Sequence, residues 1–92
     1  MDYYRWNYSK NQDLKAKRGI GFESVIMHIE RGDLLNVVNH PNTERYPNQQ
    51  ILVVEIDDYV YLVPFVENDE GRFLKTIIPS RKATRDYLGD GR

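Results

Sequence analysis

Three cations near the C-terminus have the side-chain types and the spacing that bind a phosphate group. Arg81 and Arg85 are four residues apart, so a helix would place both guanidinium groups on one face. Arg81 would lie in the first helical turn, where free backbone N–H groups attract anions. Lys75 is a charge inside an otherwise apolar predicted strand, and it joins the arginines if it points away from the core. A solvated helix face with a surface lysine is the alternative interpretation.

Metal-free cleavage of RNA also requires proton transfer, for which the candidates are fewer. His40 lies in a polar segment within seven residues of Glu44, Arg45 and Tyr46. This segment offers a base in His40 or Glu44, a phosphate ligand in Arg45 and a ring for base stacking in Tyr46. The alternative is that His-Pro-Asn and Tyr-Pro-Asn are turn sequences and that Tyr46 covers an edge of the core.

The other histidine and a pair of tyrosines have patterns that favour structural roles. His28 lies beside the stripe formed by Ile26 and Ile29 in a predicted helix, so we expect a structural or surface side chain. Tyr59 and Tyr61 alternate along one face of a predicted strand. Such a pair can stack bases, but we expect it to belong to the core or to a protein interface.

A second group of cations lies on a predicted N-terminal helix that ends near Arg18. Its apolar content is poor, so most of its surface is expected to face water. Lys10, Lys17 and Arg18 are the candidate RNA-binding cations of this helix. Basic residues therefore gather in two segments, 10–18 and 75–85, which form one patch only if the fold brings them together.

The elements that position these groups follow from hydrophobic periodicity and from turn residues. The first predicted helix has Ser9 as its N-cap, with Gln12 completing a capping box. The last predicted helix begins after an N-cap at Ser80 and ends near Leu88. The remaining predicted elements are a strand over 3–6, a helix over 20–30, strands over 34–38, 51–56, 59–66 and 72–78, and a loop over 39–50.

Two local signals refine this picture of the strands. Asp57-Asp58 separates two apolar runs and predicts a hairpin turn. Pro64 cannot donate a hydrogen bond to a ladder, so it predicts a bulge or a sheet edge. The element order β-α-α-β-β-β-β-α indicates an α+β fold, in which an antiparallel sheet of about four strands carries two N-terminal helices and a short C-terminal helix on one face.

Length and composition limit the class of protein. The 92 residues predict one domain, and 40% hydrophobic with 29% charged residues is typical of globular chains. No apolar run approaches the roughly 20 residues of a membrane helix, and the first residues do not resemble a secretory signal. The chain has no cysteine, so we expect a cytoplasmic protein and no membrane partner. A net charge of -1 argues against strong nucleic-acid binding unless the charges are segregated.

Two motifs occupy the ends of the chain. The first stands as Tyr4-Arg5-Trp6, Lys10-Asn11 and Arg18-Gly19-Ile20-Gly21-Phe22-Glu23, and the second as Ile77-Ile78-Pro79-Ser80-Arg81-Lys82-Ala83-Thr84-Arg85. Together they resemble the BrnT-like toxins of type II toxin–antitoxin systems, whose shape is similar to the RelE-type ribonuclease toxins. The chain departs from the family pattern at Arg18, where histidine is common, and at Pro79-Ser80, where Ser-Ala is usual.

The resemblance implies a RelE-like fold for a single domain over 1–92 and an mRNA endoribonuclease that uses no metal and no cofactor. It implies two partners, a cognate antitoxin and RNA, either as free mRNA or on the ribosome. Within this frame the candidate catalytic residues are Arg81, Lys75, Arg85 and His40. The candidate RNA-binding residues are Lys10, Lys17, Arg18, Arg45 and Tyr46.

A second function stays open on the residues alone. The chain would then be a binding module of the same family with little or no catalysis, which occupies an antitoxin or regulates its operon through one. The few acid–base groups and the departures at Arg18 and Pro79-Ser80 favour this alternative. A metabolic enzyme is disfavoured, because the sequence has no glycine-rich phosphate loop, metal-ligand spacing or nucleophile elbow.

Overall fold

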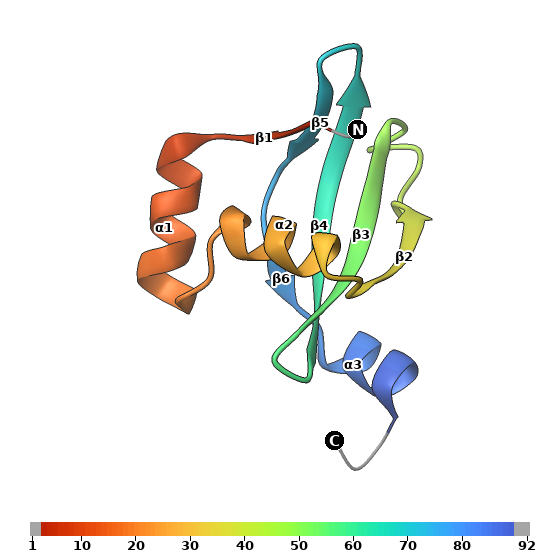
Figure 1. The fold of residues 1–92 in the computed structure, drawn as a ribbon. Helices are drawn as coiled ribbons and strands as arrows, with labels where there is room; N and C mark the ends of the chain where they lie inside the picture. Colours follow the sequence, from red (N-terminus) through yellow and green to blue (C-terminus); the bar gives the residue numbers. More distant parts are fainter. Residues whose placement is uncertain (1–2, 90–92) are drawn as a thin grey trace.

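One mixed β-sheet and three helices make up the part of the chain, residues 3–89, that the computed structural model describes (Figure 1). The elements are β1 (Tyr4–Trp6), α1 (Tyr8–Arg18), α2 (Phe22–Glu30), β2 (Leu34–Asn39), β3 (Gln49–Ile56), β4 (Tyr59–Asn68), β5 (Gly71–Leu74), β6 (Ile78–Pro79) and α3 (Arg81–Leu88). The predicted α+β class is confirmed. No helix among these residues is long and apolar enough to cross a membrane.

The sheet differs from the predicted one in strand number and direction. It has six strands in the order β1-β5-β4-β3-β2, with β6 pairing with β4 beyond the end of β5. β1 lies parallel to β5, and the other pairs are antiparallel. The expected antiparallel set of about four strands is present as β2 to β5, and β6 and the parallel strand β1 add to it. The pairing of β1 with β5 joins segments almost 70 residues apart, which local patterns do not encode.

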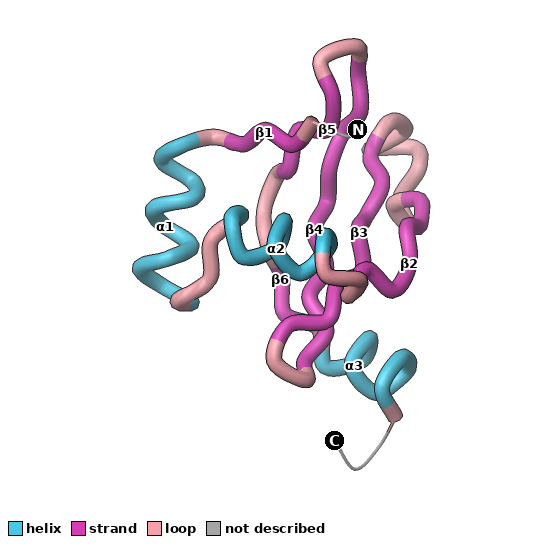
Figure 2. Tube along the Cα trace, in the orientation of Figure 1, coloured by secondary structure: helices cyan, strands magenta, loops and turns pink. Residues whose placement is uncertain are grey.

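The predicted strand over 72–78 is two short strands, β5 and β6, joined by a loop segment (Figure 2). The break lies opposite Pro64, whose carbonyl oxygen accepts a hydrogen bond from the Lys75 N–H at 2.8 Å. In an antiparallel strand the N–H and C=O of one residue face the same neighbouring strand. Pro64 has no N–H, so it can offer the segment after β5 an acceptor but no donor. The bulge or sheet edge predicted at Pro64 takes the form of a gap in the neighbouring strand, whereas β4 itself continues through Pro64 in register with Ile51. Lys75 lies just after β5 instead of inside a strand.

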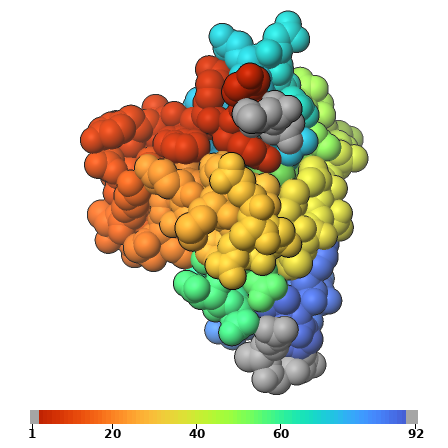
Figure 3. Space-filling model, viewed as in Figure 1, coloured from red at the N-terminus to blue at the C-terminus, as the bar shows by residue number. Residues whose placement is uncertain are grey.

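Both faces of the sheet are buried, and the helices divide between them. The first face carries Leu52, Val54, Val63, Phe65 and Leu74, which pack against apolar side chains of α1 and α2. Figure 3 shows α1 and α2 covering much of the molecule on this side. The second face carries the alternate residues of the same strands, including the buried Ile51, Val53 and Val60.

Helix α3 contacts the second face, so the expectation that all helices pack on one face was wrong. The Tyr87 hydroxyl accepts a hydrogen bond from Asn36 Nδ2 at 3.0 Å, and Asn36 lies opposite Val53 of the second face. The reason is visible in β3, where residues 51–54 are all buried. A strand that is apolar on both sides requires cover on both sides.

The N-cap of α1 lies two residues before the predicted one at Ser9. The helix begins at Tyr8, and the Asn7 side chain accepts the Lys10 N–H at 2.9 Å. Asparagine and serine are about equally good N-caps, so the sequence alone did not distinguish Asn7 from Ser9. Gln12 therefore completes no capping box, and its amide donates to the Tyr8 hydroxyl at 3.2 Å. The predicted end near Arg18 is confirmed, and Gly19 follows it with φ of 73°.

Asn11 joins the two N-terminal helices. Its Oδ1 accepts the Phe22 N–H at 2.7 Å, and its Nδ2 donates to both carboxylate oxygens of Glu23 at 3.0 Å. A Cβ atom on Gly21 would lie 2.8 Å from the Asn11 Oδ1, which explains the glycine there. Trp6 stacks on Phe22 with ring centroids 5.5 Å apart. The residues of the N-terminal motif therefore hold β1, α1 and α2 together.

Two local predictions in the C-terminal half are confirmed. Asp57 and Asp58 have φ of 53° and 65°, as a type I′ hairpin turn requires, and they join β3 to β4. The Ser80 side chain accepts the Ala83 N–H at 3.0 Å and caps α3. The Thr84 hydroxyl fixes that helix to the sheet, since it accepts the Val60 N–H at 2.8 Å and donates to the Ser80 carbonyl at 2.7 Å.

Candidate nucleic-acid interface

An aromatic ring with two cations lies on the second face, near the β4–β5 hairpin. Phe73 is a half-buried residue of β5, between its register partners Arg5 of β1 and Val66 of β4. The Arg5 guanidinium lies 5.9 Å from the centroid of the Phe73 ring, and the Lys75 Nζ lies 5.4 Å from it. Both cations are exposed, and the Arg5 guanidinium also pairs with the Glu70 carboxylate at 3.1 Å. The group combines a flat apolar surface with the Lys75 charge and with an arginine whose charge is shared with Glu70.

Sequence reasoning selected Lys75 but missed Arg5 and Phe73. Within β5 the side chains of Arg72 and Leu74 point to the first face, so Phe73 between them points to the second. That alternation was available from the sequence. The register with β1, which places Arg5 beside Phe73, was not.

The two arginines of α3 lie further along the same face of the sheet. Arg81 and Arg85 are exposed and one helical turn apart. The Ser80 N–H donates to the Val60 carbonyl, whereas the Lys75 N–H donates to that of Pro64. These anchor points are four residues apart on β4, or roughly 13 Å. We name Arg5, Phe73, Lys75, Arg81 and Arg85 the basic strip.

His40 lies far from Arg81 and Arg85, so the structure does not bring these candidate catalytic residues together. The backbone N–H of His40 donates to the Gln49 carbonyl at 3.0 Å, and Gln49 is the first residue of β3, opposite Val66 of β4. The start of α3 is bonded to Val60, six residues or about 20 Å back along β4. Sequence distance does not tell which end of a sheet a loop occupies.

The hydrogen bonding of His40 also disfavours a role as general base. Its Nδ1 lies 3.0 Å from the Asn42 N–H and accepts that hydrogen bond. A neutral imidazole with its Nδ1 lone pair engaged carries its proton on Nε2, so it has no free nitrogen to take another proton.

The loop before β3 gathers the predicted ring and cation, but in a turn-like arrangement. Tyr46 packs on the His40 ring, with centroids 4.4 Å apart, and the Arg45 guanidinium lies 5.5 Å from the Tyr46 centroid. Asn42 accepts the Arg45 N–H through its side chain and the Tyr46 N–H through its carbonyl. These bonds match the alternative in which the segment is turn chemistry.

The cations of α1 lie on the opposite side of the sheet from the basic strip. Lys10, Lys17 and Arg18 are all exposed on α1, which packs against the first face. The two basic segments of the sequence therefore form two separate surfaces. The reason is topological, because α1 follows β1 onto one face whereas α3 follows β6 onto the other.

The tyrosine pair belongs to the first face, as expected for core or interface residues. Tyr59 and Tyr61 lie edge to face, with centroids 5.7 Å apart, and Tyr61 packs against the core. Burial raises the pKa of Tyr61 above its ordinary value of 10.0, the charges of Asp57 and Tyr59 add to the rise, and Arg18 opposes it. The pair is therefore partly desolvated.

His28 is buried in a structural contact, as predicted. Its Nδ1 lies 2.8 Å from the Asp33 carboxylate, which also contacts the Arg31 guanidinium at 3.2 Å. The three acidic residues Glu55, Asp57 and Asp58 line the same small hollow. The carboxylates around this hollow disfavour contact with a nucleic-acid phosphate.

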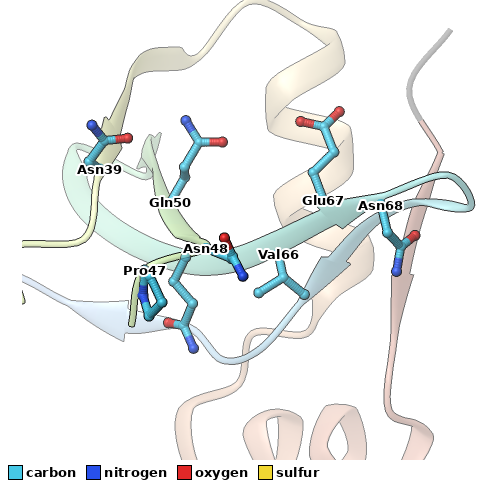
Figure 4. Close-up of a pocket in the computed structure, with 8 residues that line it drawn as sticks. Asn39, Pro47, Asn48, Gln50, Val66, Glu67 and Asn68 are labelled. Atoms are coloured by element: carbon cyan, nitrogen blue, oxygen red, sulfur yellow. The ribbon is translucent and has the colours of Figure 1, made fainter. Parts of the chain in front are cut away.

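A larger hollow, of about 470 Å³, lies where β3 begins beside β4. Figure 4 shows its polar lining, with Asn39, Gln50 and Glu67 on one side of the ribbon and Pro47 and Asn48 on the other. The sequence prediction treated residues 39–50 as a loop and did not identify this hollow. Amides scattered over two strands and a loop meet there only after folding.

Comparison with known proteins returns no matching family model, no significantly similar curated protein and no significantly similar solved structure. The functional argument therefore stands on the geometry described above and on the motifs in the sequence.

Proposed function

We propose that this protein is the toxin of a type II toxin–antitoxin pair, a metal-independent mRNA endoribonuclease that a cognate antitoxin inhibits. The motifs at the two ends of the chain suggest the family. The observation that supports action on RNA is the basic strip, in which two cations contact the Phe73 ring and two arginines follow on the same face of the sheet. Stacked bases and nearby cations are how single-stranded RNA is held.

The strip's residues suggest distinct roles in cleavage. Arg81 and Arg85 stabilise the negative charge that grows on the phosphate as the 2′-oxygen attacks and the bond to the 5′-oxygen breaks. The 2′-OH proton passes to solvent water, because the cations of the strip are exposed. An arginine cannot release a proton at physiological pH, whereas a lysine ammonium can. Lys75 is therefore the strip residue suited to protonate the leaving 5′-oxygen. Arg5 and Phe73 bind the RNA strand beside the reacting phosphate.

The alternative is a binding module of the same family without cleavage. The observation in its favour is that none of the five strip residues has a carboxylate or imidazole to accept the 2′-OH proton, and that the neighbouring Glu70 carboxylate is paired with Arg5 at 3.1 Å. His40 lies at the end of β4 remote from Arg81 and Arg85, with its Nδ1 engaged. Such a protein would bind RNA or an antitoxin and leave the phosphodiester bond intact.

Expression of the chain alone in bacterial cells separates the two functions. The proposed function predicts arrested growth and fragmented mRNA, and Lys75→Ala or Arg81→Ala should relieve both. Lys82→Ala is the matched control, because Lys82 is an exposed α3 cation paired with Asp86 outside the strip. Normal growth with intact RNA in cells that accumulate the folded chain would exclude the nuclease.

Binding of a fluorescent single-stranded RNA in vitro then tests the strip itself. Each phosphate contact contributes about 0.7 to the slope of log affinity against log salt for a single strand. Arg5→Ala and Lys75→Ala should each weaken binding and reduce that slope, and Lys82→Ala should change neither. Equal effects of all three substitutions would show that the protein attracts RNA by diffuse charge and not by the strip.

A further inference from the structure

The hollow at the start of β3 is a notch in the sheet. β3 begins at Gln49, opposite Val66, so the last two residues of β4, Glu67 and Asn68, extend beyond it toward the β4–β5 turn. The chain leaves this edge through Pro47 and Asn48. The resulting space of about 470 Å³ is in the range of small-molecule sites.

The lining of the notch has the chemistry that recognises a nucleobase edge. Five residues contribute side-chain amides: Asn39, Asn48, Gln49, Gln50 and Asn68. An amide presents a donor beside an acceptor, which matches the paired groups on base edges. Glu67 adds a carboxylate, which only accepts hydrogen bonds and which lies 3.6 Å from the Arg72 Nε.

The notch is continuous with the basic strip. Gln49, Val66, Phe73 and Arg5 are register partners on four neighbouring strands and form one row across the second face. Adjacent strands lie about 4.8 Å apart. Val66 therefore lines the notch and also lies beside the Phe73 ring on the second face. Glu67, the register partner of Arg72, lines the notch from the first face, so an RNA strand on the ring passes around the start of β3 to reach this carboxylate.

We propose that the notch is a base-binding subsite for single-stranded RNA and that it favours bases with an exocyclic amino group over uracil. This inference rests on the proposed function, since it names part of the substrate. The amino group of adenine, cytosine or guanine donates to the Glu67 carboxylate, as carboxylates accept from cytosine in known complexes. Uracil carries a carbonyl oxygen in place of that amino group, so its only donor to the carboxylate is the ring N3–H, which two carbonyl oxygens flank.

Side-chain amide signals in a ¹⁵N NMR spectrum report on the notch directly and require no catalysis. Titration with cytidine monophosphate should shift the NH₂ signals of Asn48 and Gln49. The signal of Gln12 on α1 is the internal control and should stay in place. Uridine monophosphate should bind at least about fivefold more weakly, the lower limit for one lost hydrogen-bonded pair. Unshifted notch amides, or shifts with a capped alanine peptide and not with nucleotides, would overturn the proposal.

Substitutions separate base recognition from phosphate binding. Glu67→Gln should bring the affinities for cytidine- and uridine-containing oligonucleotides within about twofold of each other, because a carboxamide can also donate to uracil. Lys75→Ala should weaken both probes equally and leave their ratio unchanged. A cytidine-to-uridine ratio that Glu67→Gln does not alter would refute the role of the carboxylate.

The same experiments distinguish failure of the subsite from failure of the toxin function. Notch signals that shift with cytidine monophosphate, in a protein that neither arrests growth nor cleaves RNA, support the subsite and reject the nuclease. Cleavage of RNA with unshifted notch amides rejects the subsite and retains the nuclease.

Discussion

Replacing Asn11 with alanine tests whether one buried side chain holds the two N-terminal helices together. Asn11 is 3% exposed and makes three hydrogen bonds, one from the Phe22 N–H and two to the Glu23 carboxylate. Phe22 is fully buried, so its N–H is left without this acceptor in the variant. A buried donor without a partner costs about 1–3 kcal/mol.

The contact with Glu23 adds a smaller amount, because that carboxylate is half exposed to solvent. We take about 0.5–1 kcal/mol for it, as for exposed charged pairs. The expected loss is therefore about 1.5–4 kcal/mol in the free energy of unfolding. At roughly 0.05–0.15 kcal/mol per residue, a chain of this length has about 5–14 kcal/mol in total. The substitution removes a large share of it.

Urea unfolding, followed by circular dichroism and by the fluorescence of Trp6, measures this loss. Asn7→Ala is the matched control, since it removes an exposed cap from the same helix and should cost about 1 kcal/mol. Asn11→Asp keeps the acceptor for Phe22 but places a carboxylate against Glu23, so its deficit should shrink as the pH falls and one carboxyl group takes up a proton. A loss from Asn11→Ala no greater than that from Asn7→Ala, at equal urea dependence, would refute the reasoning.

Three further predictions follow from local geometry. Asp58→Gly should raise the free energy of unfolding by about 0.5–1 kcal/mol and the urea midpoint with it, because Asp58 has a positive φ that glycine adopts without strain and Asp-Gly is a preferred type I′ turn pair. An unchanged midpoint would contradict this. Thr84→Val should lose about 1–3 kcal/mol by removing both hydrogen bonds of the hydroxyl, and Thr84→Ser should retain most of it, as thermal unfolding would show. The pKa of Glu23 lies below its ordinary 4.5, because the carboxylate accepts hydrogen bonds from Asn11, from the Glu23 backbone N–H and from Lys15. The stabilisation by the ionised Glu23 is therefore present above pH 4.5 and is lost as the pH falls through the lower pKa of the folded state. Glu23→Gln should therefore flatten the acid limb of a plot of stability against pH.

The features predicted correctly from the sequence are those that neighbouring residues determine. Ser80 caps α3, which ends at Leu88 as expected, and Asp57-Asp58 make the hairpin turn, because caps and turns depend on contacts within a few residues. Pro64 indicated a local irregularity of the sheet, which lies in the neighbouring strand between β5 and β6, since the lack of an N–H is a property of the residue itself.

The features that were missed depend on contacts between distant segments. The parallel pairing of β1 with β5 places Arg5 beside Phe73, and nothing near either residue indicates it. The same limit explains His40, which was grouped with the arginines although the two ends of β4 separate them. Charge type selected Lys75, Arg81 and Arg85, but only the sheet determines which cations share a surface.

The break opposite Pro64 has a consequence for how the protein opens. Because the outer edge of β4 pairs with β5 above the break and with β6 below it, the C-terminal segment forms its own short ladder of two residue pairs. Together with the contacts of Ser80, Thr84 and Tyr87, these pairs form a small cooperative unit. Such a unit can detach by sub-global unfolding while β5 stays in place. Amide protons of β6 and α3 should then exchange with water sooner than those of β3, and Arg81 and Arg85 would move apart from Lys75 without global unfolding.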